Sequence, residues 1–87
     1  MRISKNSKPT TVAGAISARV RDHQRVCLAC IGRDCVAVAV RAIVIARGFL
    51  SQDAIDISFR PEFKDINFKD GRTSSSLQVT RIAILFA

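Results

Sequence analysis

A fifteen-residue stretch between two glycines, Arg33 to Arg47, most constrains how this chain can fold. It is rich in β-branched residues, which suit strands as well as helices. Its length favours a helix, because roughly fifteen residues without a turn would be long for a strand, and Gly48 is a typical stop signal. A helix here carries apolar residues on two sides, one with Val36, Ala39, Val40 and Ile43 and the other with Val38 and Ile45. Such a helix is buried on two sides, and in a chain of only 87 residues we expect the second side to meet another subunit.

Shorter patterns on either side of this stretch predict the remaining elements. Val12, Ile16 and Val20 recur at four-residue spacing, which indicates an apolar helical stripe. Apolar and polar residues alternate over 55–60, which predicts a half-buried strand, and residues 61–72 form a polar loop with a turn signal. The predicted elements are strands at 2–4, 26–31, 55–60 and from 77 onward, and helices at 9–25 and 33–47. Their order is β-α-β-α-β-β, in a single domain that spans residues 1–87.

Positive charge is concentrated in the first part of the chain. The whole sequence has 14 Lys and Arg against 7 Asp and Glu, a formal net charge of +7. Residues 1–50 carry nine of the basic residues and two of the acids, so the entire excess lies there, and residues 51–87 are neutral. A solvated face is one explanation. Such complete segregation favours a directed basic surface for an anionic partner, either nucleic acid or an acidic protein surface.

Several other classes of function lack support in the sequence. His23, Cys27, Cys30 and Cys35 contain zinc-ligand residue types, but a strand over 26–31 would point Cys27 and Cys30 to opposite faces. We therefore predict no metal and no other cofactor, and the odd number of cysteines argues against a disulfide. There is no nucleophile pair and no phosphate-binding glycine fingerprint, so we predict neither an enzyme nor a small-molecule substrate. The longest apolar stretch has eleven residues and is interrupted by Arg41, too few for a membrane span, so we expect a soluble intracellular protein.

Two loops carry the basic residues that are best placed for an anion. Lys5 and Lys8 flank the start of the first helix, where unpaired backbone N–H groups and the positive end of the dipole already favour negative charge. The loop between the last two strands contains a second group of cations, Lys64, Lys69 and Arg72. Phe63 and Phe68 lie in that loop, and they either stack on bases or pack against the core.

Two blocks of sequence resemble a known family. Residues 7–15 read SKPTTVAGA, and residues 39–49 read AVRAIVIARGF. Both are similar to motifs of the stage V sporulation protein S family, the first to its opening block and the second to its second helix. Ile31-Gly32 and Asp70-Gly71 also fall where that family has them. The resemblance covers roughly residues 2–80.

The resemblance implies a fold, a function and a set of contacts. The fold is an α+β domain similar to Alba chromatin proteins, with two helices packed on a four-stranded mixed sheet. The function is non-enzymatic binding of DNA or RNA in the bacterial cytoplasm or nucleoid, in sporulation or septation, by a homodimer or larger assembly. By position, the family pattern assigns nucleic-acid contacts to Lys5, Lys8, Lys64, Lys69 and Arg72, and it matches Arg41 and Arg47 to basic positions of the second helix.

The chain also departs from the family pattern. Arg33-Asp34 stands where the family usually has small residues, which adds a cation to the predicted nucleic-acid contacts. The three cysteines are local substitutions, and the tail over 82–87 is more apolar than the family's usual charged ending. Two alternatives remain open from the sequence. One is a structural subunit of a ribonucleoprotein that docks through its basic half and apolar tail, and the other is a metal- or redox-responsive regulator that uses the cysteines.

Overall fold

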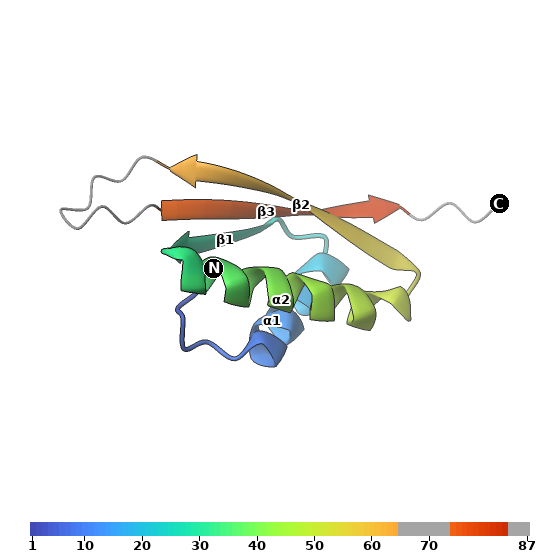
Figure 1. The fold of residues 1–87 in the computed structure, drawn as a ribbon. Coiled ribbons are helices and arrows are strands. Elements are labelled where there is room, and N and C mark those ends of the chain that lie inside the picture. Colours follow the sequence, from blue (N-terminus) through green and yellow to red (C-terminus); the bar gives the residue numbers. More distant parts are fainter. Residues whose placement is uncertain (65–73, 84–87) are drawn as a thin grey trace.

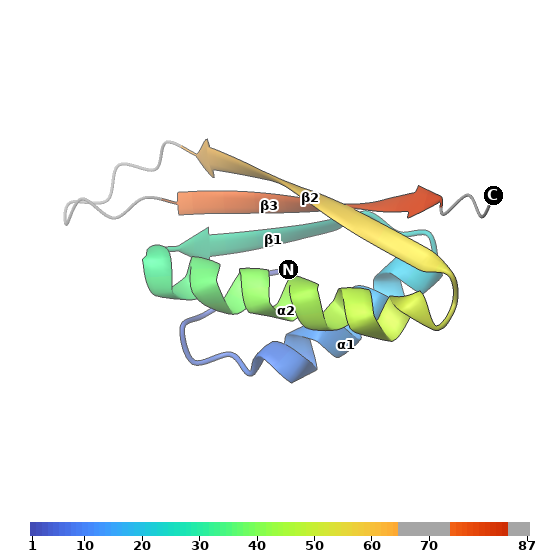
Figure 2. The ribbon, with the colours of Figure 1, turned by 45° about the vertical axis from the view of Figure 1, so that its right-hand side comes forward.

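Two helices cover one face of a three-stranded antiparallel sheet (Figure 1). The computed structural model describes residues 1–64 and 74–83. Its elements are α1 (Pro9–Arg21), β1 (Val26–Ile31), α2 (Arg33–Ser51), β2 (Ile55–Lys64) and β3 (Ser74–Ala83). Figure 2 shows both helices on the same side of the sheet, while its other face has no covering element within the described residues. The structure is therefore the two-layer α+β arrangement that the sequence predicts.

The sheet has the order β1-β3-β2, with β3 in the centre. Val26 pairs with Val79 in the β1–β3 ladder, and Phe59 pairs with the same residue in the β2–β3 ladder. The register aligns the apolar positions of the three strands on the face that meets the helices, because side chains alternate along each strand. The buried residues on that face are Val26, Leu28, Cys30, Ile55, Ile57, Leu77 and Val79.

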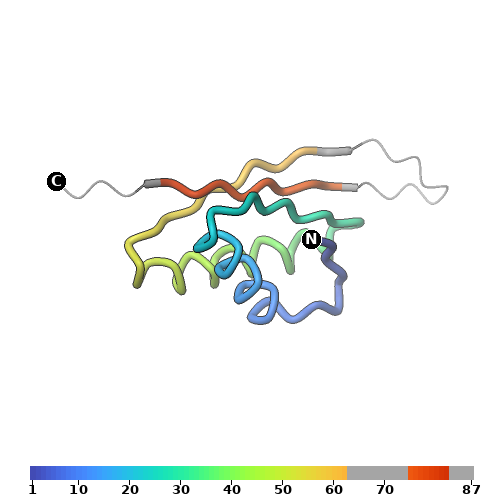
Figure 3. Tube along the Cα trace, turned by 180° about the vertical axis from the view of Figure 1, so that it is seen from behind, coloured from blue at the N-terminus to red at the C-terminus, as the bar shows by residue number. Residues whose placement is uncertain are grey.

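The predicted four-stranded mixed sheet is wrong, since the described residues contain only three strands. Arg2 forms an isolated parallel bridge with Ala29 instead of a strand. The N–H of Ala29 donates to the carbonyl of Met1 at 2.8 Å, and the N–H of Ile3 donates to the carbonyl of Ala29 at 2.9 Å. A hydrogen-bonded turn from Ser4 to Ser7 then leads the chain away from β1. The N-terminal segment thus lies beside β1 (Figure 3) but is too short to extend the ladder.

The first helix ends earlier than predicted. It stops at Arg21, not Arg25, because His23 adopts a left-handed backbone conformation with φ 57°. The N–H of His23 donates to the carbonyl of Val20 at 3.1 Å, and the N–H of Gln24 donates to the carbonyl of Arg19 at 2.9 Å. These two bonds form a Schellman motif, in which the left-handed position is usually glycine. A histidine in this position is hard to anticipate from sequence.

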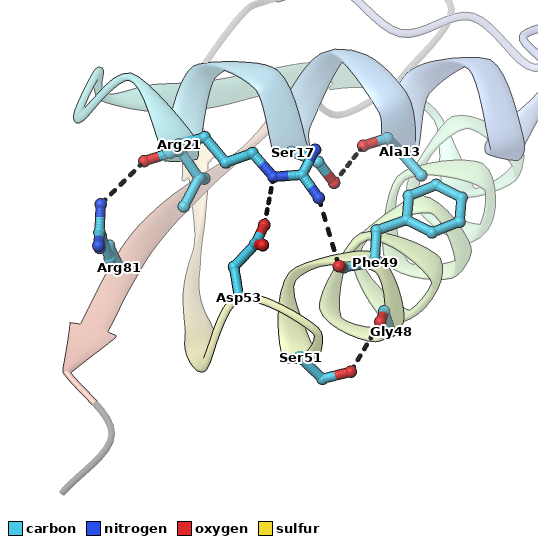
Figure 4. Close-up of polar contacts among 9 residues, drawn as sticks. Ala13, Ser17, Arg21, Gly48, Phe49, Ser51, Asp53 and Arg81 are labelled. Carbon is cyan, nitrogen blue, oxygen red and sulfur yellow. Dashed lines mark hydrogen bonds and ion pairs between the residues drawn. The ribbon is translucent and has the colours of Figure 1, made fainter.

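The second helix runs past its predicted stop. Gly48 lies inside α2, which continues to Ser51. Leu50 is fully buried in the core, so the extra turn places a large apolar side chain under the sheet. The guanidinium of Arg21 donates to the carbonyl of Phe49 at 3.3 Å and to Asp53 at 2.7 Å (Figure 4). These contacts with α1 stabilise the last turn against the helix-breaking tendency of glycine.

Strand β2 also extends beyond its predicted end. Pro61 was predicted to start a loop, yet the strand continues to Lys64, and Pro61 pairs with Leu77. Within the described residues β2 is an edge strand, and a proline is tolerated at an edge because its missing N–H can face away from the ladder. The predicted start of the last strand is late as well, since β3 begins at Ser74.

Ala54 provides a test of the connection between α2 and β2. Its φ of 57° lies in the left-handed region, which costs a non-glycine residue about 1–3 kcal/mol. Glycine would remove that strain but add about 0.4–1 kcal/mol of chain entropy to the unfolded state. We expect Ala54→Gly to raise the free energy of unfolding by about 0.5–1 kcal/mol in urea denaturation. Ala37→Gly, at an exposed position within α2, is the matched control and should lower it by about 1 kcal/mol.

Candidate nucleic-acid interface

A hollow of about 610 Å³ opens where β1 ends and α2 begins. Two segments line it, residues 2–6 before the first helix and residues 29–35 at the junction of β1 and α2. The bridge between Arg2 and Ala29 holds these segments together, although they are far apart in sequence. Three cations line the hollow, Arg2, Lys5 and Arg33, and all three are exposed.

The start of α2 contributes backbone donors to this hollow. Gly32 occupies the N-cap position with φ 82°, a conformation that favours glycine, and no side chain caps the helix. The first N–H groups of a helix have no intrahelical partner, and the positive end of the dipole lies there. Asp34 lies in the first turn and is the one acid among the described lining residues. The three cations outnumber it, so the hollow favours an anion.

Local contacts hold the loop that carries Lys5. Ile3 is buried in the core, which anchors the segment on its N-terminal side. The N–H of Ser4 donates to the Oγ of Ser7 at 3.1 Å, and the N–H of Ser7 donates to the carbonyl of Ser4 at the same distance. The N–H of Asn6 donates to the Oγ of Ser4 at 3.3 Å. Lys5 therefore projects from a hydrogen-bonded turn.

Lys8 lies at the start of the other helix. It is the N-cap residue of α1, its side chain makes no capping hydrogen bond, and Pro9 follows in the first turn. Lys8 is exposed and belongs to the loop that carries Lys5. Of the predicted contacts, Lys5 and Arg33 thus line one hollow, and Lys8 lies three residues along the chain from Lys5 at a second uncapped helix start.

The two predicted cations of α2 lie in different surroundings. Arg41 is exposed on the helix. Arg47 instead pairs with Asp56 of β2, through Nε–Oδ1 at 2.7 Å and Nη2–Oδ2 at 3.3 Å. The hydrogen bonds from Arg47 and from the N–H of Ile57 lower the pKa of Asp56 below its ordinary value. The structure therefore uses Arg47 to join α2 to β2.

The remaining predicted contacts belong to β2 and to the segment that follows it. Lys64 lies at the same end of the sheet as the hollow, because it pairs with Ser74, which also pairs with Ile31 at the end of β1. Lys64 is the last residue of β2, and Lys69 and Arg72 fall outside the described residues, as does Phe68. Arg2 is a basic residue of the hollow that no sequence pattern singles out. The charge segregation included it, but only its backbone bridge to β1 places it beside Lys5.

The cysteines do not form a metal centre in the part of the chain that the structure describes. No group of three His, Cys, Asp or Glu residues there could hold a metal ion. Cys30 is buried in the core, and burial raises the pKa of its thiol, with Cys35 and then Cys27 adding to the effect. Cys27 lies on the opposite face of β1, where its Sγ is 3.1 Å from the Oγ of Ser76. No helix among the described residues has the length and apolar character needed to cross a membrane.

The fold and the hollow define a small α+β domain with exposed basic residues at its helix starts. The family model for stage V sporulation protein S matches residues 1–83. The chain therefore belongs to the SpoVS family, a family of non-enzymatic sporulation proteins.

The pair formed by Arg47 and Asp56 predicts a specific acid dependence of stability. Because the folded-state pKa of Asp56 lies below its ordinary value of 3.8, the pair stabilises the fold fully above that pH and is lost as the pH falls through the lower, folded-state value. We expect Asp56→Asn to lower the unfolding temperature at pH 7, with the difference from the parent protein shrinking as the pH falls below 3.8. In an Arg47→Ala background the same substitution should have a much smaller effect. An equal effect in both backgrounds would show that the two residues are not coupled.

Proposed function

We propose that this protein binds nucleic acid, DNA or RNA, through its phosphate backbone, as a non-enzymatic factor in bacterial sporulation or septation. The observation that carries the proposal is the hollow lined by Arg2, Lys5 and Arg33 at the uncapped start of α2. The family supports the sporulation-related role. A single domain that works in the cytoplasm, in association with the nucleoid, is part of the same proposal.

The chemistry of the hollow favours phosphates over bases. Helix N-termini and clustered cations are a recurrent way to hold phosphate oxygens. The described residues that line the hollow include no aromatic side chain, so it lacks the platform on which bases stack. Contacts of this kind depend on charge and not on base edges, so they give little sequence specificity.

Exposed apolar side chains on α2 and on β2 support the formation of a homodimer. Val44 is 65% exposed on α2, and Phe59 is 39% exposed on β2. Strand β2 is an edge of the described sheet, so its backbone is open to a partner. A second copy that covered these apolar side chains would bury them and bring two basic hollows into one particle, which would extend the contact with a nucleic acid.

A salt titration of binding tests the proposed function. Duplex DNA and single-stranded RNA, each with a fluorophore, would be titrated by anisotropy at several salt concentrations. If six to ten phosphates are contacted, affinity should fall by roughly 10³ to 10⁵ between 50 and 200 mM salt. Lys5→Ala combined with Arg33→Ala should reduce the slope of log K against log salt by about 2.

The control for that titration is a variant of equal charge. Arg19 is exposed on α1 and does not line the hollow. Arg60 is likewise exposed, on β2, and lies outside the hollow. Arg19→Ala combined with Arg60→Ala removes the same number of charges, and we expect a smaller change of slope. An equal change in both double variants would mean that net charge alone, and not the hollow, governs binding. A flat salt dependence would contradict phosphate binding altogether.

The exposed apolar side chains make a separate prediction about assembly. Val44→Glu places a charge in the centre of the proposed interface, so we expect the protein to become monomeric in light scattering coupled to gel filtration. Because Val44 is largely exposed in the single chain, the substitution should leave the circular dichroism spectrum unchanged. Ala18→Glu, at an exposed position of α1, should not alter the assembly. A Val44→Glu protein with the parent's mass would place the interface elsewhere.

A further inference from the structure

A second cavity lies at the opposite end of β1 from the basic hollow. Its volume is about 750 Å³, within the range of about 300–1,000 Å³ that is usual for small-molecule sites. It is formed by the residues that follow α1, by the start of β1 and by the later part of β3. The two cavities share no lining residue.

The sheet leaves this cavity open because its strands have different lengths. The β1–β3 ladder ends at the pair Val26 and Val79. Beyond that pair β3 continues to Ala83, bound only to β2 within the described residues. One side of β3 therefore faces the cavity without a neighbouring strand. Val20, Val26 and Val79, all buried, supply apolar lining, while the exposed Gln78 and Thr80 supply polar groups.

Two arginines and a histidine contribute the charge of the cavity. Arg25, Arg81 and His23 line it, and its described lining contains no Asp or Glu. Neither arginine forms an ion pair with any residue that the structure describes. Arg21 and Arg47 are neutralised by carboxylates. Arg25 and Arg81 have no such counter-ion among the described residues, although they line the same concave site. This arrangement points to an anionic ligand.

Arg81 is held in place at one side of its guanidinium. Its Nη1 donates to the carbonyl of Val20 at 3.4 Å, at the end of α1 (Figure 4). The same atom lies 3.0 Å from Nδ1 and 3.3 Å from Nε2 of His23. Nε and Nη2 have no hydrogen-bond partner among the described residues. A guanidinium fixed in this way can present two parallel N–H groups to an oxyanion.

His23 lines the cavity, and its backbone is in the left-handed conformation. Glycine would close the same Schellman turn with less strain, whereas a histidine is strained in this conformation. Strain of this kind is characteristic of binding sites, where the side chain has a role that offsets it. A glycine at position 23 would close the turn but would place no imidazole ring beside Arg81.

We propose that this cavity binds a small phosphomonoester of about nucleotide size. The two guanidinium charges of Arg25 and Arg81 match the charge of about −1.5 to −2 on a phosphate ester at pH 7, better than the single charge of a carboxylate. Donors from two separate parts of the chain, the connection after α1 and strand β3, suit a tetrahedral group. The volume exceeds the needs of a free phosphate ion, so it leaves room for the body of the ligand beside the valines. The site is independent of the proposed nucleic-acid surface.

Calorimetric titration of the whole protein tests this site, with adenosine 5′-monophosphate as the probe. We expect saturable binding of this nucleotide, weaker binding of inorganic phosphate and none of adenosine. A single-stranded oligonucleotide with a 5′-phosphate, compared with its 5′-hydroxyl form, distinguishes a nucleic-acid end from a free nucleotide as the source of the phosphate. Tighter binding of citrate than of either phosphate probe would overturn the assignment.

Variants of the cavity make the test specific. His23→Gly removes the ring and relaxes the turn, so the fold should be retained while affinity for the nucleotide falls. Arg25→Ala should weaken binding about tenfold or more, as expected for a lost charge-assisted hydrogen bond. Lys5→Ala, in the other hollow, should have no effect on the nucleotide and should still weaken binding of nucleic acid. Unchanged nucleotide affinity in both His23→Gly and Arg25→Ala would overturn the proposal, whatever the outcome for nucleic acid.

Discussion

The close contact between α1 and α2 is the constraint on which the rest of this structure depends. Ala13 of α1 and three alanines of α2, Ala39, Ala42 and Ala46, are completely buried. Small side chains let the two helix backbones approach closely, so both can lie on one face of a sheet of only three described strands. Ser17 is also buried, and its hydroxyl donates to the carbonyl of Ala13 at 2.8 Å, so it adds no unpaired polar group to the contact.

The basic residues near the two ends of α2 have different surroundings. At the C-terminal end of α2, Arg21 of α1 pairs with Asp53 in the turn after α2, and Arg47 pairs with Asp56 of β2. At the N-terminal end of α2, the described carboxylates are fewer than the cations of the hollow, and the first backbone N–H groups have no side-chain cap. The positive charge of the hollow is therefore not neutralised by the fold, and the helix dipole there has the same sign.

Local pattern predicted the starts of both helices and of β1 and β2, but it missed several element ends and the start of β3. The stripe of Val12 and Ile16 and the alternation over 55–59 identified real elements. The ends were missed at His23, Gly48 and Pro61, because long-range contacts outweighed the local signal at each of them. Burial of Leu50 stabilises α2 beyond Gly48. Pairing with β3 extends β2 beyond Pro61. The Schellman motif after α1 has a histidine where glycine is usual.

The sequence by itself determined the family, the two-layer α+β class and the excess of positive charge in the first fifty residues. These follow from short-range periodicity, recognisable motifs and composition, which neighbouring residues encode. Only the tertiary structure decided which charges act together. It brought Lys5 and Arg33 to one hollow through the backbone bridge between Arg2 and Ala29, and it paired Arg47 with Asp56. It also opened a second cavity, with Arg25 and Arg81, where β1 begins. Contacts between residues that are distant in sequence depend on strand register and helix packing, which no local pattern specifies.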